Sequence, residues 1–171
     1  MIIKTKKFTL RLYKKSDIVN LQKNVNDKEI YRYTLRIPYP YTLKDAKNFI
    51  DKNLKIQKIK KKSVINFAID MKNEVIGGIS LENIEGHKAE IGYWLARKHW
   101  NKGIMTDAVR KVSDLGFKKL KLKRIYSHVL KENKRSLKVL ENNKFQREGL
   151  LRKIAMKDGK YIDAYIYSKI K

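Results

Sequence analysis

One stretch of the sequence, KAEIGYWLARKHWNKGIMT at residues 88–106, constrains the fold more than any other. Residues 89–95 alternate between the two sides of an extended chain, which is the period of a strand. The basic, Gly-containing segment 97–103 predicts a loop, and apolar residues at helical spacing predict a helix from about Ile104. Such a junction presents unpaired backbone N–H groups and a helix dipole to an anion. The stretch therefore predicts a strand, a loop and a helix that together could hold a phosphate group.

Length and composition limit the class of protein. A chain of 171 residues, 42% of them hydrophobic, suits one domain with its own core, so we expect a single domain over residues 1–171. The absence of cysteine excludes disulfides, cysteine nucleophiles and thiolate metal sites, and it suits a reducing compartment. No apolar run reaches membrane-spanning length, and residues 1–10 lack the apolar core of a signal peptide. We therefore expect a cytoplasmic protein with no membrane partner.

The net charge of +25, from 42 Lys and Arg against 17 Asp and Glu, is extreme. A field of this sign favours nucleic acids, ribosomes, anionic surfaces or a phosphorylated cofactor. The lysines are spread through almost every segment and are not gathered with interleaved aromatic residues. This distribution favours a solvated basic surface over a dedicated RNA site, so nucleic acid is expected only through the generic charge.

The remaining sequence predicts alternating helices and strands. Strands are expected at residues 8–12, 64–71, 75–81, 124–130, 145–156 and 161–170, and helices after Ser16, at 26–33, after Thr42 and at 133–142. Ser16 is a candidate N-cap, and Thr42 with Asp45 resembles a capping box. Gly77 and Gly78 suggest a bulge or a close approach inside a strand, and residues 82–86 are expected to turn the chain. The pattern predicts one α/β (α+β) domain with a mixed, mostly antiparallel sheet.

The segments IGYWL, HWNKGIMTDAV, ENKRSLKVLENNKF and REGLLR resemble the GNAT superfamily of acetyl-CoA-dependent N-acetyltransferases. Within it they are similar to the ribosomal-protein-alanine N-acetyltransferase (RimJ/RimL-like) branch. The resemblance covers nearly the whole chain, from FTLRLY to DAYIYSKI. It implies a GNAT-like domain with a twisted sheet flanked by helices, acetyl-CoA as cosubstrate and no metal. The acceptor that it implies is the N-terminal α-amine of a protein, such as a ribosomal protein, and a homodimer is compatible with it.

The resemblance places the phosphate loop at residues 100–105, with backbone amides as donors. Lys98, Lys102 and Lys138 could pair with the phosphates. Asn101 replaces a common glycine, and asparagine tolerates left-handed backbone angles better than most residues. The open strand edge at residues 91–95 could pair with the amides of the pantetheine arm. Asn133 matches an arm-contacting asparagine and is also a candidate N-cap. The cofactor-binding residues implied in this way are Ile91, Tyr93, Trp94, Leu95, Lys98, Asn101, Lys102, Gly103, Ile104, Met105, Thr106, Asn133 and Ser136.

Two residues are the catalytic candidates. Ser136 matches the serine that replaces a tyrosine acid in this branch; Tyr126, Tyr161 and Tyr165 are alternatives. Glu90 matches a glutamate that acts as base directly or through water, and an apolar environment would help a carboxylate to accept a proton. Glu82 and Glu85 are alternative bases, and Glu90 could instead be a surface carboxylate paired with a lysine. The three histidines, His87, His99 and His128, have no metal-ligand spacing.

The expected reaction is direct attack of an amine on the thioester in a ternary complex, since there is no cysteine to form an acyl-enzyme. A polyamine or aminoglycoside is the alternative acceptor, but a cationic acceptor needs an acidic pocket. The available carboxylates for such a pocket are Asp27, Glu29, Glu82, Glu85 and Glu90. A non-enzyme alternative is a protein of the same fold that binds CoA or RNA without catalysis.

Overall fold

The computed structural model describes residues 2–60 and 62–171; Met1 and Lys61, which belong to the expected domain, lie outside the described residues. The strands are β1 (Ile2–Lys4), β2 (Thr9–Arg11), β3 (Ile65–Met71), β4 (Glu74–Glu85), β5 (Lys88–Leu95), β6 (Arg124–Leu130), β7 (Gln146–Lys157) and β8 (Lys160–Ile170). The helices are α1 (Ile18–Val25), α2 (Lys28–Tyr33), α3 (Leu43–Gln57), α4 (Ile104–Lys118) and α5 (Lys134–Asn142), with short 3-10 turns η1 (Lys15–Asp17) and η2 (Arg97–His99).

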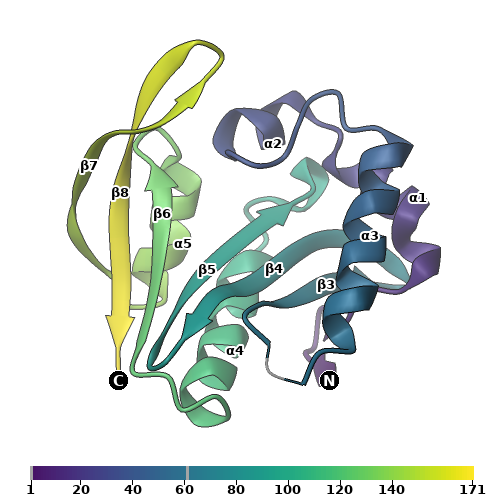
Figure 1. Ribbon diagram of the computed structural model, residues 1–171, viewed down its shortest axis with the longest axis horizontal. Coiled ribbons are helices and arrows are strands. Elements are labelled where there is room, and N and C mark those ends of the chain that lie inside the picture. The colour runs from purple at the N-terminus through teal and green to yellow at the C-terminus, as the bar shows by residue number, and fades with distance from the viewer. Residues whose placement is uncertain (1, 61) are drawn as a thin grey trace.

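The strands of the described chain form one sheet in the order β1-β2-β3-β4-β5-β6-β8-β7. Neighbouring strands are antiparallel except β5 and β6, which run parallel. The expected mixed, mostly antiparallel sheet is therefore confirmed. Figure 1 shows β3–β5 on one side of an opening and β6, β8 and β7 on the other.

Helices cover both faces of the sheet. One buried cluster contains Phe67 and Ile69 with the apolar side of α4, and a second contains Ala68 with residues of α1 and α3. Because Ala68 alternates with Phe67 and Ile69 along β3, the two clusters lie on opposite faces. No helix in residues 2–60 and 62–171 combines the length and apolar character needed to cross a bilayer.

Helix caps agree with the sequence at one position and differ at another. Thr42 accepts from the Asp45 N–H while the Asp45 carboxylate accepts from the Thr42 N–H, so the capping box before α3 is confirmed. The prediction that Ser16 caps a helix is wrong, because Ser16 lies inside η1. Asp17 occupies the N-cap position of α1 without a side-chain hydrogen bond to that helix. Its nearly fully buried carboxylate accepts from the Lys14 N–H at 2.8 Å and pairs with Arg11 at 2.7 Å.

Strand β4 differs from its prediction in length. It continues to Glu85, so the expected turn at residues 82–86 is wrong and the chain reverses at residues 86–87. Both alternatives for the glycine pair are found. Ile69 of β3 pairs with Gly77, but the next residue, Asp70, pairs with Val75, so one residue of β4 is bulged beside Gly77. A Cβ on Gly78 would lie 2.4 Å from the Tyr13 hydroxyl, which is the close approach. Strand β1, which the sequence analysis missed, pairs with β2 at the edge of the sheet.

Candidate active site

The site begins where β5 and β6 separate. The two strands pair only from Lys88 to Glu90 on β5 and from Arg124 to Tyr126 on β6, after which they diverge (Figure 1). Beyond Glu90, β5 keeps β4 on one edge and leaves its other edge without a strand partner. A cavity of about 1330 Å³ occupies this region. An open strand edge inside a cavity can accept an extended, amide-containing ligand as an added strand.

The loop before α4 has the geometry of an anion site. Asn101 has φ 59° and Gly103 has φ 74°, so both adopt left-handed angles, and α4 begins directly after Gly103. The first N–H groups of a helix have no partner within that helix, and here the first residues of α4 line the cavity. The Trp100 indole N–H donates to the Leu95 carbonyl at 2.7 Å, which ties the loop to the end of β5. The strand, loop and helix expected from the sequence are therefore present, and phosphate binding by the loop stays a prediction.

One cavity brings together every predicted site residue except Lys98. Those lining it are Glu90, Ile91, Tyr93, Trp94, Leu95, Asn101, Lys102, Gly103, Ile104, Met105, Thr106, Asn133 and Ser136. The Lys98 ammonium instead pairs with Glu74 at 2.8 Å, so the structure does not bring it to the cavity. Cations that do line this end include Lys134, Arg135 and Lys138 on α5. Their binding roles, like those of the other residues, stay predictions.

At the start of α5, Ser136 contacts both Asn133 and, across the opening, Tyr93 on β5. Asn133 accepts from the Ser136 N–H at 3.1 Å, so its predicted role as N-cap of α5 is confirmed. The Ser136 and Tyr93 hydroxyls are 2.8 Å apart, and either one can be the donor. Burial raises the pKa of Tyr93, and the hydrogen bond with Ser136 offsets part of the rise. The pair therefore places two protonated hydroxyls on the cavity wall.

The alternative tyrosines lie elsewhere. None of Tyr126, Tyr161 and Tyr165 lines the cavity, and Tyr161 is 67% exposed on the β7–β8 hairpin. Tyr165 packs against the main core. Tyr93, which the sequence analysis named only as a cofactor contact, is the tyrosine beside Ser136.

Glu90 sits at the point where the strands separate, with a side chain 18% exposed. One of its oxygens accepts from the Asn83 amide at 3.1 Å, and the other lies 3.1 Å from Nδ1 of His128 on β6. The environment that would help a carboxylate to accept a proton, an apolar one, is therefore absent around these atoms, because polar groups contact both oxygens. These contacts fix the orientation of the carboxylate at the cavity edge. The alternative, a surface Glu90 paired with a lysine, is wrong, since the carboxylate contacts an amide and an imidazole.

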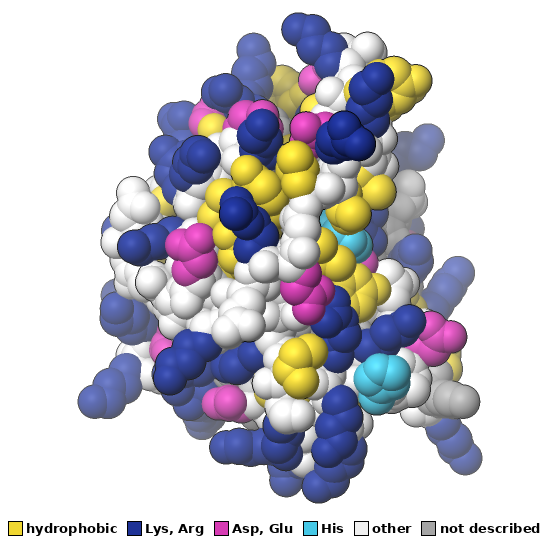
Figure 2. All heavy atoms as spheres, turned by 90° about the vertical axis from the view of Figure 1, so that its left-hand side faces the viewer, with side chains coloured by type: hydrophobic (Ala, Val, Ile, Leu, Met, Phe, Trp, Pro, Cys, Tyr) yellow, Lys and Arg dark blue, Asp and Glu magenta, His cyan; other side chains and the backbone are white. Residues whose placement is uncertain are grey.

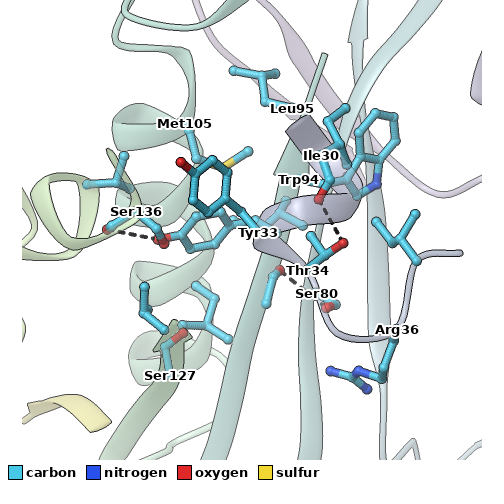
Figure 3. Close-up of a pocket in the computed structure, with 18 of the residues that line it drawn as sticks. Ile30, Tyr33, Thr34, Arg36, Ser80, Trp94, Leu95, Met105, Ser127 and Ser136 are labelled. Carbon is cyan, nitrogen blue, oxygen red and sulfur yellow. Dashed lines mark hydrogen bonds between the residues drawn. The ribbon is translucent and has the colours of Figure 1, made fainter. Parts of the chain in front are cut away.

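A second carboxylate, Glu82, lies directly beside Glu90 on the neighbouring strand. Glu82 on β4 is in register with Glu90 on β5, and its oxygens contact Arg36 at 2.5 Å and the Ser80 hydroxyl at 2.7 Å. Like charges directly opposite in a sheet repel each other. The Arg36 guanidinium offsets the charge of Glu82, and this makes it easier for the two carboxylates to lie side by side. In Figure 3, Arg36, Thr34 and Trp94 lie on the side of the pocket opposite Ser127 and Ser136.

The hairpin of β7 and β8 contacts α2 above this pocket. The Lys157 ammonium donates to the carbonyls of Tyr31 and Thr34 and lies 3.6 Å from the centre of the Tyr31 ring. The Tyr31 hydroxyl donates to Asp158. Two segments far apart in the sequence therefore meet over the opening, and Thr34 is held beside the cavity.

Three residues were missed by sequence reasoning as members of this site. Tyr33 and Arg36 come from α2 and the segment after it, where the sequence shows no motif. His128 was considered only for metal binding. Its signal was available, because β6 follows the predicted strand at residues 89–95 and His128 alternates with Tyr126 along it. His99 also lines the cavity, and burial, with the charges of Lys98 and Lys102, lowers its pKa.

Among the described residues, no group of three or more His, Cys, Asp or Glu side chains is arranged to hold a metal ion. The features present are a loop with two left-handed residues before a helix, an open strand edge, a hydroxyl pair and an oriented carboxylate. Together they suit a phosphate-bearing, amide-containing ligand beside a group that can exchange a proton.

Comparisons with known proteins agree with this geometry. A family model described as an acetyltransferase (GNAT) domain matches residues 7–146. The uncharacterized N-acetyltransferase p20 of Bacillus licheniformis is 34% identical over 169 residues, which are 98% of this chain and 94% of that protein. The structure of a ribosomal-protein-S5-alanine acetyltransferase from Vibrio fischeri matches with a TM-score of 0.88 and 27% identity over 99% of this chain and 96% of that one.

A third match shares the fold. The structure of RimL, a ribosomal L7/L12 alpha-N-protein acetyltransferase in complex with coenzyme A, gives a TM-score of 0.90 at 23% identity, over 99% of this chain and 98% of that one. These matches define an enzyme that transfers an acetyl group to an amine. The chain belongs to the GNAT acetyltransferase family, with RimJ/RimL-like relatives, and acetyl-CoA is its cosubstrate.

Proposed function

We propose that the chain acetylates the N-terminal α-amine of a protein, of the ribosomal type, by direct attack in a ternary complex. The proposal includes a cytoplasmic location, which the lack of cysteine suits. A homodimer stays a prediction. The names of the relatives support a protein acceptor, and the contacts of the acidic side chains around the site support it further.

The contacts of the acidic side chains around the site are the main support for the proposal. Four of the five acidic residues that could receive a cationic acceptor already contact a cation: Asp27 with Arg97 at 3.6 Å, Glu29 with Arg32 at 3.7 Å, Glu82 with Arg36 at 2.5 Å and Glu85 with Lys88 at 3.9 Å. The fifth, Glu90, contacts His128. A polyamine or aminoglycoside needs several free carboxylates, whereas one α-amine needs one base. This difference favours a singly charged acceptor amine.

The surface charge fits a ribosomal acceptor. Figure 2 shows Lys and Arg side chains scattered over the face that carries β7 and β8, with no single cationic patch. A net charge of +25 attracts a large polyanion such as a ribosome at long range and speeds encounter without specific contacts. The charge therefore supports approach to the acceptor and does not by itself select it.

The residues present fit acetyl-CoA, which supplies an acetyl group activated as a thioester. The N–H groups at the start of α4, with Lys102 and Arg135 nearby, would hold the phosphates. The free edge of β5 would hydrogen-bond the amides of the arm and direct it along residues 91–95. Holding two reactants in one cavity removes much of the entropic cost of their encounter.

Proton transfer falls to Glu90 and to the hydroxyl pair. The acceptor amine attacks the thioester carbonyl carbon, and Glu90 takes the amine proton directly or through one water. Asn83 and His128 keep its carboxylate oriented. The Ser136 hydroxyl, hydrogen-bonded to Tyr93, gives a proton to the departing thiolate. The new amide bond forms as the carbon–sulfur bond breaks.

Replacement of Ser136 by Ala is expected to lower kcat only about tenfold, because Tyr93 remains as a proton donor beside it. The double variant Ser136→Ala with Tyr93→Phe is expected to lose about 100-fold. Steady-state kcat with saturating acetyl-CoA measures both. If the double variant keeps the activity of the single one, the hydroxyl pair is not the acid.

The acceptor is tested by thiol release from acetyl-CoA with peptides beginning Ala, Ser or Met, with spermidine, with an aminoglycoside and without acceptor. We expect thiol release with one or more peptides and only background release with spermidine and with the aminoglycoside. Release with spermidine or the aminoglycoside alone would overturn the proposed acceptor. Binding of acetyl-CoA with no release from any amine would favour the CoA-binding alternative.

A further inference from the structure

We call the part of the cavity around Glu82 and Glu90 the acceptor end. The guanidinium of Arg36 lies there and has no part in the mechanism above. Arg36 lies between α2 and α3 and lines the cavity, and its Nη1 contacts Glu82 at 2.5 Å. Glu82 is held from its other oxygen by the Ser80 hydroxyl at 2.7 Å. The Arg36 side chain is 71% exposed, and this carboxylate is its one hydrogen-bond partner within the described chain. A guanidinium has five N–H donors, so most remain available to a ligand.

The position of this group relates it to the reacting amine. Glu82 is directly opposite Glu90, and the next pair along the two strands is Ser80 with Gly92. A Cβ on Gly92 would lie 3.5 Å from the Ser80 hydroxyl and 3.8 Å from the Glu82 carboxylate. Gly92 therefore leaves this part of the cavity floor uncovered. An acceptor whose amine reaches Glu90 would place its next atoms over Gly92, toward Glu82 and Arg36.

The cations of the cavity fall into two groups. Lys102, Lys134, Arg135 and Lys138 come from the phosphate loop and α5, whereas Arg36 and Lys52 come from the α2–α3 side. Within the second group, Arg36 contacts Glu82, the carboxylate directly opposite Glu90. A guanidinium recognises carboxylates better than an ammonium does, because its planar fork can form two parallel hydrogen bonds.

We propose that Arg36 determines specificity by binding a carboxylate that the acceptor carries close to its reacting amine. Two sources share this chemistry: an acidic side chain at the second or third position of a protein N-terminus, and the α-carboxylate of a free amino acid. The first source rests on the proposed function and deepens it, since it selects among protein N-termini. Arg36 would then contact Glu82 and the acceptor carboxylate through different N–H groups.

The test compares kcat/KM for acceptors that differ only in charge. The peptides begin Ala-Glu, Ala-Gln and Ala-Lys, and the free amino acids are glutamate and alanine, with the wild-type chain, Arg36→Gln and Arg32→Gln. Arg32 is a matched control, because it is also an exposed arginine paired with a glutamate and does not line the cavity. We expect wild type to prefer Ala-Glu over Ala-Gln, and Arg36→Gln to reduce that preference about fivefold, the scale of an exposed ion pair.

The outcomes separate the two claims. If peptides are acetylated with the same charge preference in wild type and Arg36→Gln, the role of Arg36 is wrong and the proposed function stands. If only free amino acids react, and Arg36→Gln lowers their kcat/KM while Arg32→Gln does not, Arg36 binds the α-carboxylate and the protein acceptor is wrong. A loss equal for every acceptor would show that Arg36 only balances the charges of Glu82 and Glu90, and would overturn the inference.

Discussion

Replacement of Glu90 by Gln is expected to lower kcat by about 100-fold or more, with little change in the KM for acetyl-CoA. The amide keeps the size of the side chain and can still hydrogen-bond to Asn83, but it cannot take a proton from the acceptor amine. Initial rates measured over a range of acetyl-CoA concentrations and over a range of acceptor concentrations give kcat and the KM of each substrate. A shift in the acceptor KM with unchanged kcat would show that Glu90 binds the acceptor and is not the base.

The matched control is Glu85→Gln. Glu85 lies on the same strand as Glu82 and was an alternative base from the sequence, but its side chain is 83% exposed and it does not line the cavity. Its loss removes the same charge a few residues away. We expect Glu85→Gln to keep near wild-type kcat. An equal loss in both variants would mean that net acidity near the site, and not a base at Glu90, supports the reaction.

Replacement of Gly103 by Val is expected to raise the KM for acetyl-CoA by about 30-fold. Gly103 has φ 74° and ψ 0°, and left-handed angles cost a β-branched residue about 2 kcal/mol or more, a factor of ten for each 1.4 kcal/mol. The loop would relieve this strain by turning the N–H groups at the start of α4 away from the cavity. Isothermal titration with coenzyme A measures the same loss as a weaker Kd.

Gly159→Val separates this effect from general strain. Gly159 has φ +73°, nearly the same as Gly103, and a Cβ there would meet no atom within 4 Å. It lies in the turn between β7 and β8, away from the phosphate loop. Both variants should lose similar stability in a thermal melt, and only Gly103→Val should bind coenzyme A more weakly. Equal weakening in both would show that the loop N–H groups do not bind the phosphates.

Much of the fold followed from local patterns. The strand at residues 89–95, the turn at Asp158 and Gly159 and the capping box of Thr42 depend on alternation, backbone angles and short-range hydrogen bonds, which the sequence displays directly. Strand β1 was not predictable in this way, because three residues are too few for a period and β1 is defined by pairing with β2. Ser16 does not cap α1 because it lies inside η1, a 3-10 turn of three residues that ends at Asp17 directly before α1, and three residues are again too few to show a period.

The site was predictable where it depends on one continuous segment. The loop at residues 100–106 and the Asn133 cap are local, and the structure places both at the cavity. Contacts between segments were not predictable. The pairs Tyr93 with Ser136 and Glu90 with His128 depend on how β5 and β6 diverge. Lys98 does not line the cavity because it forms an ion pair with Glu74 on β4.

The most direct test of the central claim uses a peptide with a free N-terminus and one internal lysine, incubated with deuterated acetyl-CoA and fragmented in a mass spectrometer. The account predicts one deuterated acetyl group, on the α-amine, and its near absence with Glu90→Gln. Acetylation of the lysine side chain alone, or an unmodified peptide under conditions where another class of amine is acetylated, would contradict it.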